Sequence, residues 1–157
     1  MADFNIKEEY NKLKDKYKLP SFDNIDEEFE LLVLEKKGFV LRLVRRRMNE
    51  KAIFFCNIIE RILYPNPQFI PLMHESKFLD SKKDDLFKLY KKLMSYERRS
   101  VDLDVRSSKE KEDADFIKDL FKDWNEFKEK LTDVTGGLSK FWLTEYKEKK
   151  EGEAYFG

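Results

Sequence analysis

The stretch FVLRLVRRRMNEKAIFFCNIIERIL, residues 39–63, decides the fold of this chain. It contains no glycine or proline, and its apolar residues return every three or four positions. At 100° per residue they gather on one side of a helix, while the polar residues fall on the other. The apolar set is Val40, Leu41, Val44, Met48, Phe55, Ile58, Ile59 and Ile62. The pattern predicts an amphipathic helix of about 25 residues, roughly 38 Å long, at the centre of the domain.

Two cations interrupt the apolar side of this predicted helix. Arg47 and Lys51 project into the sector that Val44 and Phe54 occupy, where an unpaired charge is unfavourable. Pairing with acids elsewhere in the chain would resolve the conflict. In that case Arg47→Ala is expected to destabilise the fold by about 2–4 kcal/mol, because it would leave a partly buried acid without its partner.

The composition indicates one well-packed helical domain. The chain has 157 residues, of which 41% are charged and 15% aromatic, and the aromatic content separates it from disordered proteins. Five glycines and four prolines favour long elements with short connections. We therefore predict an all-α fold, a single-domain bundle of five to seven helices over residues 1–157. A short C-terminal tail, 151–157, is expected to be flexible.

The chain carries no feature of a secreted or membrane protein. Its one cysteine, Cys56, rules out an intramolecular disulfide. The N-terminal segment MADFNIKEEYNKLKDK is charged throughout, unlike a signal peptide. No apolar run approaches the 18 residues of a membrane span. We expect a cytoplasmic protein that does not associate with membranes.

Around the central helix, periodicity predicts further helices. They are expected at 4–18, at a short stretch with Ile25, Phe29 and Leu32 inward, at 72–79, and from a cap at Ser81 to about residue 100. Ile117, Leu120, Trp124, Phe127, Leu131 and Val134 predict a long helix that ends at Gly136-Gly137, followed by a last helix over 138–150. The central helix should pack against 86–94 and 117–134. The alternating segment VDLDV, 101–105, is predicted to be extended.

The segment 29–44 has two interpretations. It reads either as a β-hairpin with Lys37-Gly38 in the turn, or as a helix break at Gly38 followed by the central helix. Strict alternation is absent, and the second half continues smoothly into the helical pattern. The helix break is therefore preferred.

The cations of the central helix are the first candidate for function. Residues 36–61 hold eight basic and two acidic residues, whereas residues 1–35 and 101–157 are net acidic. The candidate binding surface is Arg42, Arg45, Arg46, Arg47 and Lys51. Such a cluster can pair with the chain's own acids, bind an acidic protein, or follow a phosphate backbone. Internal pairing is favoured because the basic middle of the chain is flanked by acidic ends that can neutralise it.

The inventory for catalysis is small. His74 is the one histidine, Cys56 sits among apolar residues, and no zinc-binding spacing occurs. The pairs Asp102/Asp104 and Asp113/Asp115 resemble oxygen ligands for a divalent cation, but no calcium-loop glycine or phosphate-binding loop accompanies them. Packing near helix ends and pairing with arginines explain them better. We predict no cofactor, no metal and no enzymatic activity.

Aromatic residues near the C-terminus are the second candidate. Phe141, Trp142, Tyr155 and Phe156 can dock on the protein's own body or in a partner's groove. Together these features predict a non-enzymatic helical protein–protein interaction module, an adaptor or small subunit. The first alternative is a nucleic-acid-associated protein that binds phosphates through the helix carrying Arg42–Arg47. The second is a metal-dependent enzyme that uses the aspartate pairs.

Overall fold

The computed structural model describes residues 4–34 and 38–151, with side chains described as far as Thr144. Within these ranges the chain forms six α-helices, two short 3-10 turns and no strand. The helices are α1 (Ile6–Tyr17), α2 (Phe22–Phe29), α3 (Val40–Leu63), α4 (Ile70–Phe78), α5 (Lys83–Val105) and α6 (Glu110–Glu151), and the turns are Leu31–Val33 and Asp80–Lys82. The predicted all-α bundle of five to seven helices is confirmed.

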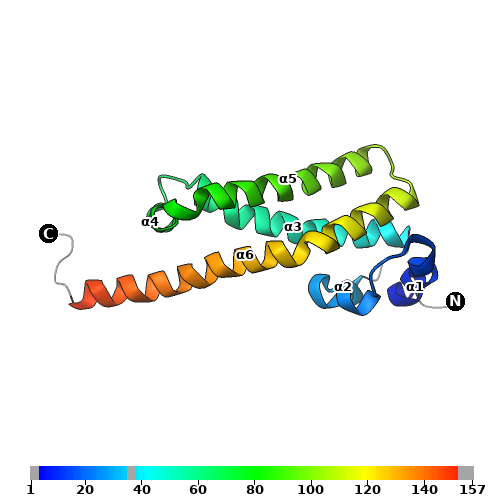
Figure 1. The fold of residues 1–157 in the computed structure, drawn as a ribbon, viewed down its shortest axis with the longest axis horizontal. Coiled ribbons are helices and arrows are strands. Elements are labelled where there is room, and N and C mark those ends of the chain that lie inside the picture. Colours follow the sequence, from blue (N-terminus) through cyan, green and yellow to red (C-terminus); the bar gives the residue numbers. More distant parts are fainter. Residues whose placement is uncertain (1–3, 35–37, 152–157) are drawn as a thin grey trace.

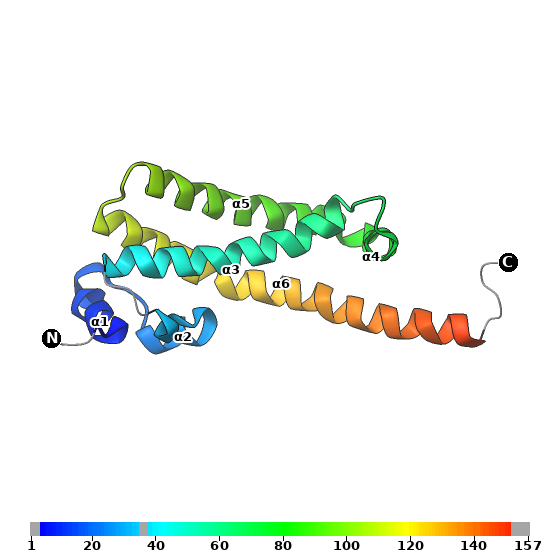
Figure 2. The ribbon, with the colours of Figure 1, turned by 180° about the vertical axis from the view of Figure 1, so that it is seen from behind.

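Three long helices, α3, α5 and α6, run lengthwise beside one another (Figure 1). The short helices α1 and α2 lie at the end where α3 begins, and α4 lies at the opposite end, as the reverse view also shows (Figure 2). Helix α3 contacts each of the other five α-helices, most extensively α5 and α6. The prediction that 39–63 forms the central helix is therefore confirmed.

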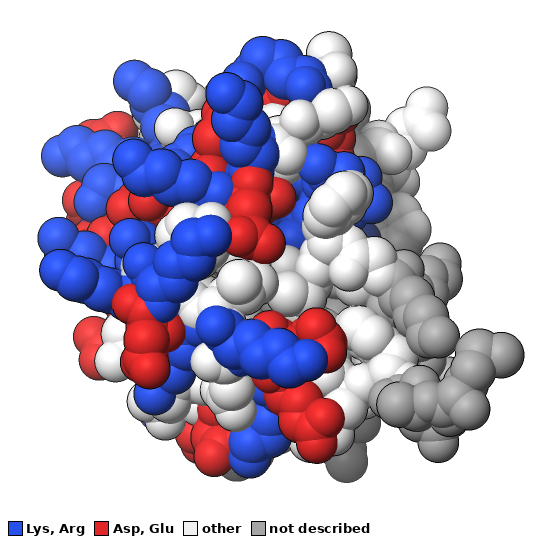
Figure 3. Space-filling model, turned by 90° about the vertical axis from the view of Figure 1, so that its right-hand side faces the viewer, with Lys and Arg blue, Asp and Glu red and all other residues white. Residues whose placement is uncertain are grey.

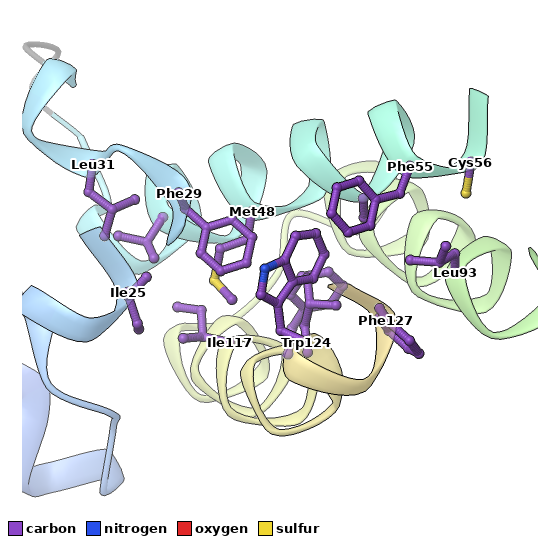
Figure 4. Close-up of a cluster of buried hydrophobic side chains, with 14 of the residues drawn as sticks. Ile25, Phe29, Leu31, Met48, Phe55, Cys56, Leu93, Ile117, Trp124 and Phe127 are labelled. Carbon is purple, nitrogen blue, oxygen red and sulfur yellow. The ribbon is translucent and has the colours of Figure 1, made fainter. Parts of the chain in front are cut away.

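The core is centred on Trp124 of α6, whose side chain is 1% exposed. Its ring stacks on Phe55 of α3 at 4.5 Å between centroids and lies 4.7 Å from Phe29 of α2. Figure 4 shows Met48 and Ile117 beside these rings. All six residues of the 117–134 pattern are buried, as their spacing predicts. One aromatic residue thus joins the N-terminal helices to the long-helix bundle.

Helix α6 differs most from the prediction. It is one helix of 42 residues, about 63 Å long at 1.5 Å per residue, and it does not end at Gly136-Gly137. The separate helix predicted for 138–150 is wrong for the same reason. Glycine lowers helix propensity by about 1 kcal/mol relative to alanine, which weakens a helix without forcing it to end. The red end of α6 projects past α4 (Figure 1).

The prediction of extended backbone at 101–105 is also wrong, because α5 runs through this segment to Val105. Leu103 is buried and lies three residues after buried Ser100, so the inward face of the helix continues. Short alternation did not outweigh the propagation of an existing helix.

The ambiguous segment 29–44 contains no strand in its described residues, and α3 begins at Val40, two residues after Gly38. The helix break at Gly38 is therefore the better of the two interpretations, while Lys37 lies outside the described residues. Leu31 is buried and Leu32 is 62% exposed, so the inward leucine was misassigned by one position. The predicted tail also lies outside the described residues, apart from Glu151 at the end of α6.

Candidate functional site

Arg45 lies at the junction of the three long helices and is completely buried, with 0% exposure. Its Nε donates to Asp113 Oδ1 of α6 at 2.7 Å, and Nη2 donates to Asp104 Oδ1 of α5. Nη1 donates to Ser100 Oγ at 2.6 Å and to the Ser100 carbonyl at 3.0 Å. Each nitrogen of the guanidinium therefore donates a hydrogen bond to another residue of the protein, and the side chain is inaccessible to a ligand.

The two aspartates that meet at Arg45 are held differently. Asp113 is 1% exposed and accepts a second hydrogen bond from Ser108 Oγ at 2.7 Å. Partial burial favours the neutral form of Asp104, but hydrogen bonds from Arg45 and Arg46 outweigh this effect and lower its pKa. A carboxylate close to a buried guanidinium is the arrangement that can compensate for desolvation of both charges.

The aspartate pairs therefore do not form a metal site in the structure. Asp104 and Asp113 converge on a guanidinium, while Asp102 pairs with Arg106 at 2.9 Å and Asp115 with Lys118 at 3.5 Å. Among the described residues, no group of three or more histidine, cysteine, aspartate or glutamate side chains is arranged to hold a metal ion.

Arg47 and Lys51 bind the C-terminal end of α2, which explains their position in the apolar sector. Arg47 Nε donates to the Phe29 carbonyl at 2.9 Å, and Lys51 Nζ donates to the Glu28 carbonyl. The last carbonyls of a helix lack partners within it and carry partial negative charge. Helix α2 has no basic residue in its own last turn. Arg47 and Lys51 of α3 therefore provide the positive charge and the hydrogen-bond donors that the C-terminal end of α2 does not have itself.

Arg47 also forms ion pairs with two exposed acids. Its Nη2 lies 3.1 Å from Glu30 Oε2, and its Nη1 lies 2.9 Å from Glu50 Oε2. These acids are 74% and 65% exposed at the side chain, so they do not depend on Arg47 for compensation. In contrast to these acids, the Phe29 carbonyl accepts a partly buried hydrogen bond from Arg47.

The remaining two arginines face the connection between α5 and α6. Arg42 Nη2 donates to the Ser108 carbonyl at 2.7 Å, and its guanidinium lies 4.7 Å from the Phe39 ring. Arg46 has a side-chain exposure of 51%, and its Nε lies 3.1 Å from Asp104 Oδ1. Figure 3 shows basic and acidic side chains interspersed over this end of the molecule. The nucleic-acid hypothesis expects a positive face with no acid within reach, and Asp104 is within reach of Arg46.

The second candidate lies at the opposite end, where α4 meets the C-terminal part of α6. The Phe78 ring stacks on Phe141 at 4.5 Å, Phe141 lies 5.2 Å from Trp142, and Trp142 lies 6.4 Å from the His74 ring. Phe78 is 47% exposed and Trp142 is 36% exposed. We call the set of exposed or partly exposed residues here the aromatic surface; its members are Ile70, Met73, His74, Phe78, Phe141 and Trp142.

Helix α4 presents this surface because its other side is anchored to the bundle. Ser76 is buried and its Oγ donates to the Ile62 carbonyl at 2.7 Å. Ile70, His74 and Phe78 follow one another at intervals of four, so they share a face of the helix. The sequence prediction included Phe141 and Trp142 but missed Ile70, Met73 and Phe78. Their four-residue spacing is the signal that could have indicated them. Tyr155 and Phe156 lie outside the described residues.

Cys56 has the environment of a packing residue. It is 4% exposed, and burial raises the pKa of its thiol to about 11, so the reactive thiolate is scarce at neutral pH. His74, the one histidine of the chain, is part of the aromatic surface through its contact with Trp142.

Comparison of the chain with protein-family models, with curated proteins and with solved structures gave no match. None of the helices in the described part of the chain has the length and apolar character needed to cross a bilayer.

Proposed function

We propose that this protein is a non-enzymatic protein–protein interaction module that binds its partner through the aromatic surface of α4 and α6. The observation that carries the proposal is the contact between three rings, Phe78, Phe141 and Trp142, at the outside of the molecule. Aromatic residues and methionine are enriched in protein interfaces, and a few buried residues, often tryptophan, tyrosine or arginine, supply most of the binding energy.

The size of the surface supports this proposal. Ile70 is 66% exposed and Met73 is 42% exposed, beside Phe78 and Trp142. Taking 150–250 Å² for each large side chain, these four residues expose roughly 400 Å². Patches of about 300–600 Å² are the largest on a typical monomer and are often functional. Lys77 and Lys140 are exposed on the same two helices and provide a polar border.

The proposed setting is the cytoplasm, because a chain with a single cysteine forms no intramolecular disulfide and so gives no sign of an oxidising compartment. The arginine cluster supports binding less well than the aromatic surface does. Four of its five cations are buried or partly buried, and Arg45, Arg46 and Arg47 have acids within ion-pair distance.

The test compares partners recovered from the native host with three tagged proteins. These are the wild type, the surface variant Phe141→Ala/Trp142→Ala, and the control variant Phe54→Ala/Phe87→Ala. Phe54 and Phe87 are 59% and 43% exposed and lie on other parts of the bundle, so the control removes a similar exposed aromatic area. Each purification is performed with and without nuclease and quantified by mass spectrometry.

The proposal expects a stoichiometric protein that survives nuclease, remains with the control variant, and is reduced at least tenfold with the surface variant. A partner retained equally by both variants would contradict the proposed surface. Partners that disappear on nuclease treatment would instead favour the nucleic-acid alternative, and Arg46→Ala would then be the next variant.

A further inference from the structure

Two consecutive glycines, Gly136 and Gly137, lie in the interior of α6. Apart from its chain neighbours and the nearby backbone of α6 itself, a methyl group built on either Cα would meet no atom within 4 Å, so packing does not require glycine at these positions. Alanine would fit and would favour the helical state about fivefold at each site. The glycines therefore weaken α6 locally without any gain in packing. A local increase in backbone freedom is their evident physical effect.

Burial along α6 changes at these glycines. Leu131 and Val134, which precede them, are 4% and 3% exposed. Beyond them Leu138 and Phe141 are only partly buried, and Trp142 is 36% exposed. The ring contacts of this last part of the helix are with α4, through Phe78 and His74. The weak point of the helix thus coincides with the boundary between its core-packed part and the part that carries the aromatic surface.

We propose that Gly136-Gly137 is a hinge that regulates the aromatic surface. In the closed form, α6 is straight and Phe141 stacks on Phe78, as in the structure. In the open form, the segment that begins at Leu138 swings away from α4 and uncovers the stacked faces of both rings. This inference rests on the proposed function, since it assigns the regulation of that same surface.

The hinge has a simple energetic basis. The closed form is held by the packing of partly buried Leu138 against the core and by side-chain contacts on α4. The two glycines together disfavour the straight helix about 25-fold relative to two alanines. A partner that binds the uncovered rings better than the stacked ones shifts the population toward the open form. Its apparent affinity is the intrinsic affinity for the open form multiplied by the fraction of molecules that are open.

The test measures distances in the isolated protein by pulsed electron paramagnetic resonance. Spin labels are placed at Lys91→Cys on the outer side of α5 and at Thr144→Cys beyond the hinge, in a Cys56→Ala background. Both label sites are exposed. The hinge predicts two distance populations in this protein. Gly136→Ala/Gly137→Ala should reduce the ratio of the second population to the closed one by about 25-fold. Phe141→Ala should increase it, because it removes the ring that holds the closed form.

A matched control is Asn125→Ala/Thr132→Ala. Both residues are exposed on α6 before the hinge, and both substitutions raise helix propensity in the part that is packed on the core. The control should leave the two populations unchanged. A single narrow distance distribution in the wild-type protein would overturn the hinge.

The hinge and the proposed function can fail separately. Two populations in the spin-labelled protein, together with equal partner recovery by the wild type and the Phe141→Ala/Trp142→Ala variant, would keep the hinge and refute the proposed function. One population, together with loss of the partner in that surface variant, would keep the function and refute the hinge.

Discussion

Replacement of Arg45 by methionine should be among the most damaging single changes in this protein. It keeps the length and much of the apolar stem of the side chain while it removes the charge. Asp113, with a side-chain exposure of 2%, would remain in the core without Arg45, and the Ser108 hydroxyl would still donate a hydrogen bond to it. Removal of one partner from a buried ion pair costs about 3–5 kcal/mol, because the other charge stays desolvated without compensation.

The assays are equilibrium unfolding in urea and thermal unfolding, each followed by tryptophan fluorescence and by circular dichroism. For a chain of this length, about 3–5 kcal/mol corresponds to a fall in Tm of roughly 6–20 °C. The control is the double variant Arg45→Met/Asp113→Leu, which removes both charges together. It should be at least about 2 kcal/mol more stable than Arg45→Met, because no charge remains stranded.

Two results would refute this reasoning about Arg45. The first is an Arg45→Met protein within about 1 kcal/mol of the wild type, which would mean that Asp113 is compensated by water or by protonation. The second is a double variant whose loss equals the sum of the losses in Arg45→Met and in the single variant Asp113→Leu, which would mean that the residues do not interact.

Three further outcomes are expected. Arg47→Ala should destabilise the fold by about 1–2 kcal/mol in urea unfolding, less than for a stranded buried acid, because its interior partner is the Phe29 carbonyl at a helix end. Burial acts to raise the pKa values of Glu28 and Asp104, but hydrogen bonds and ion pairs with their cationic partners outweigh it and lower both values in the folded state, so the unfolded chain binds more protons. Their contribution to stability is complete above about pH 5 and is lost as the pH falls below about 4, which unfolding curves at pH 6 and pH 3 will measure. With a pKa of about 11, Cys56 should resist a thiol reagent at pH 8 in the native protein and react once urea unfolds it.

The long helices of this fold and their buried sides were predictable wherever the apolar periodicity continued over several turns. Residues 40–62 and 117–134 repeat at three and four over several turns, and helix geometry converts that spacing into a buried side. The errors have a common origin in local signals. Gly136-Gly137 and the alternating segment 101–105 both argue for a break, but each lies next to a helix that extends through it at little cost per residue.

The candidate site was less predictable because it depends on proximity between distant residues. The cations of α3 were conspicuous in the sequence, but their partners were not. Arg45 meets Asp104 and Asp113 at separations of 59 and 68 residues, and charge counting does not select them from the 32 acids of the chain. The stacking of Phe78 on Phe141 likewise depends on the position of α4 against α6, which periodicity within either helix does not specify.

The buried guanidinium of Arg45 has a consequence for the choice among alternative packings. Apolar side chains such as leucine and isoleucine are largely interchangeable, so long helices that meet through them have neighbouring alignments of similar energy. A slip of one turn displaces a helix by 5.4 Å, farther than any hydrogen bond reaches. Such a slip would separate Arg45 from Ser100, Asp104 and Asp113 at the same time. Charged groups would then lie in the core without hydrogen-bond or ion-pair partners. The buried polar contacts of Arg45 thus specify the register of α3, α5 and α6, which apolar packing alone would leave open.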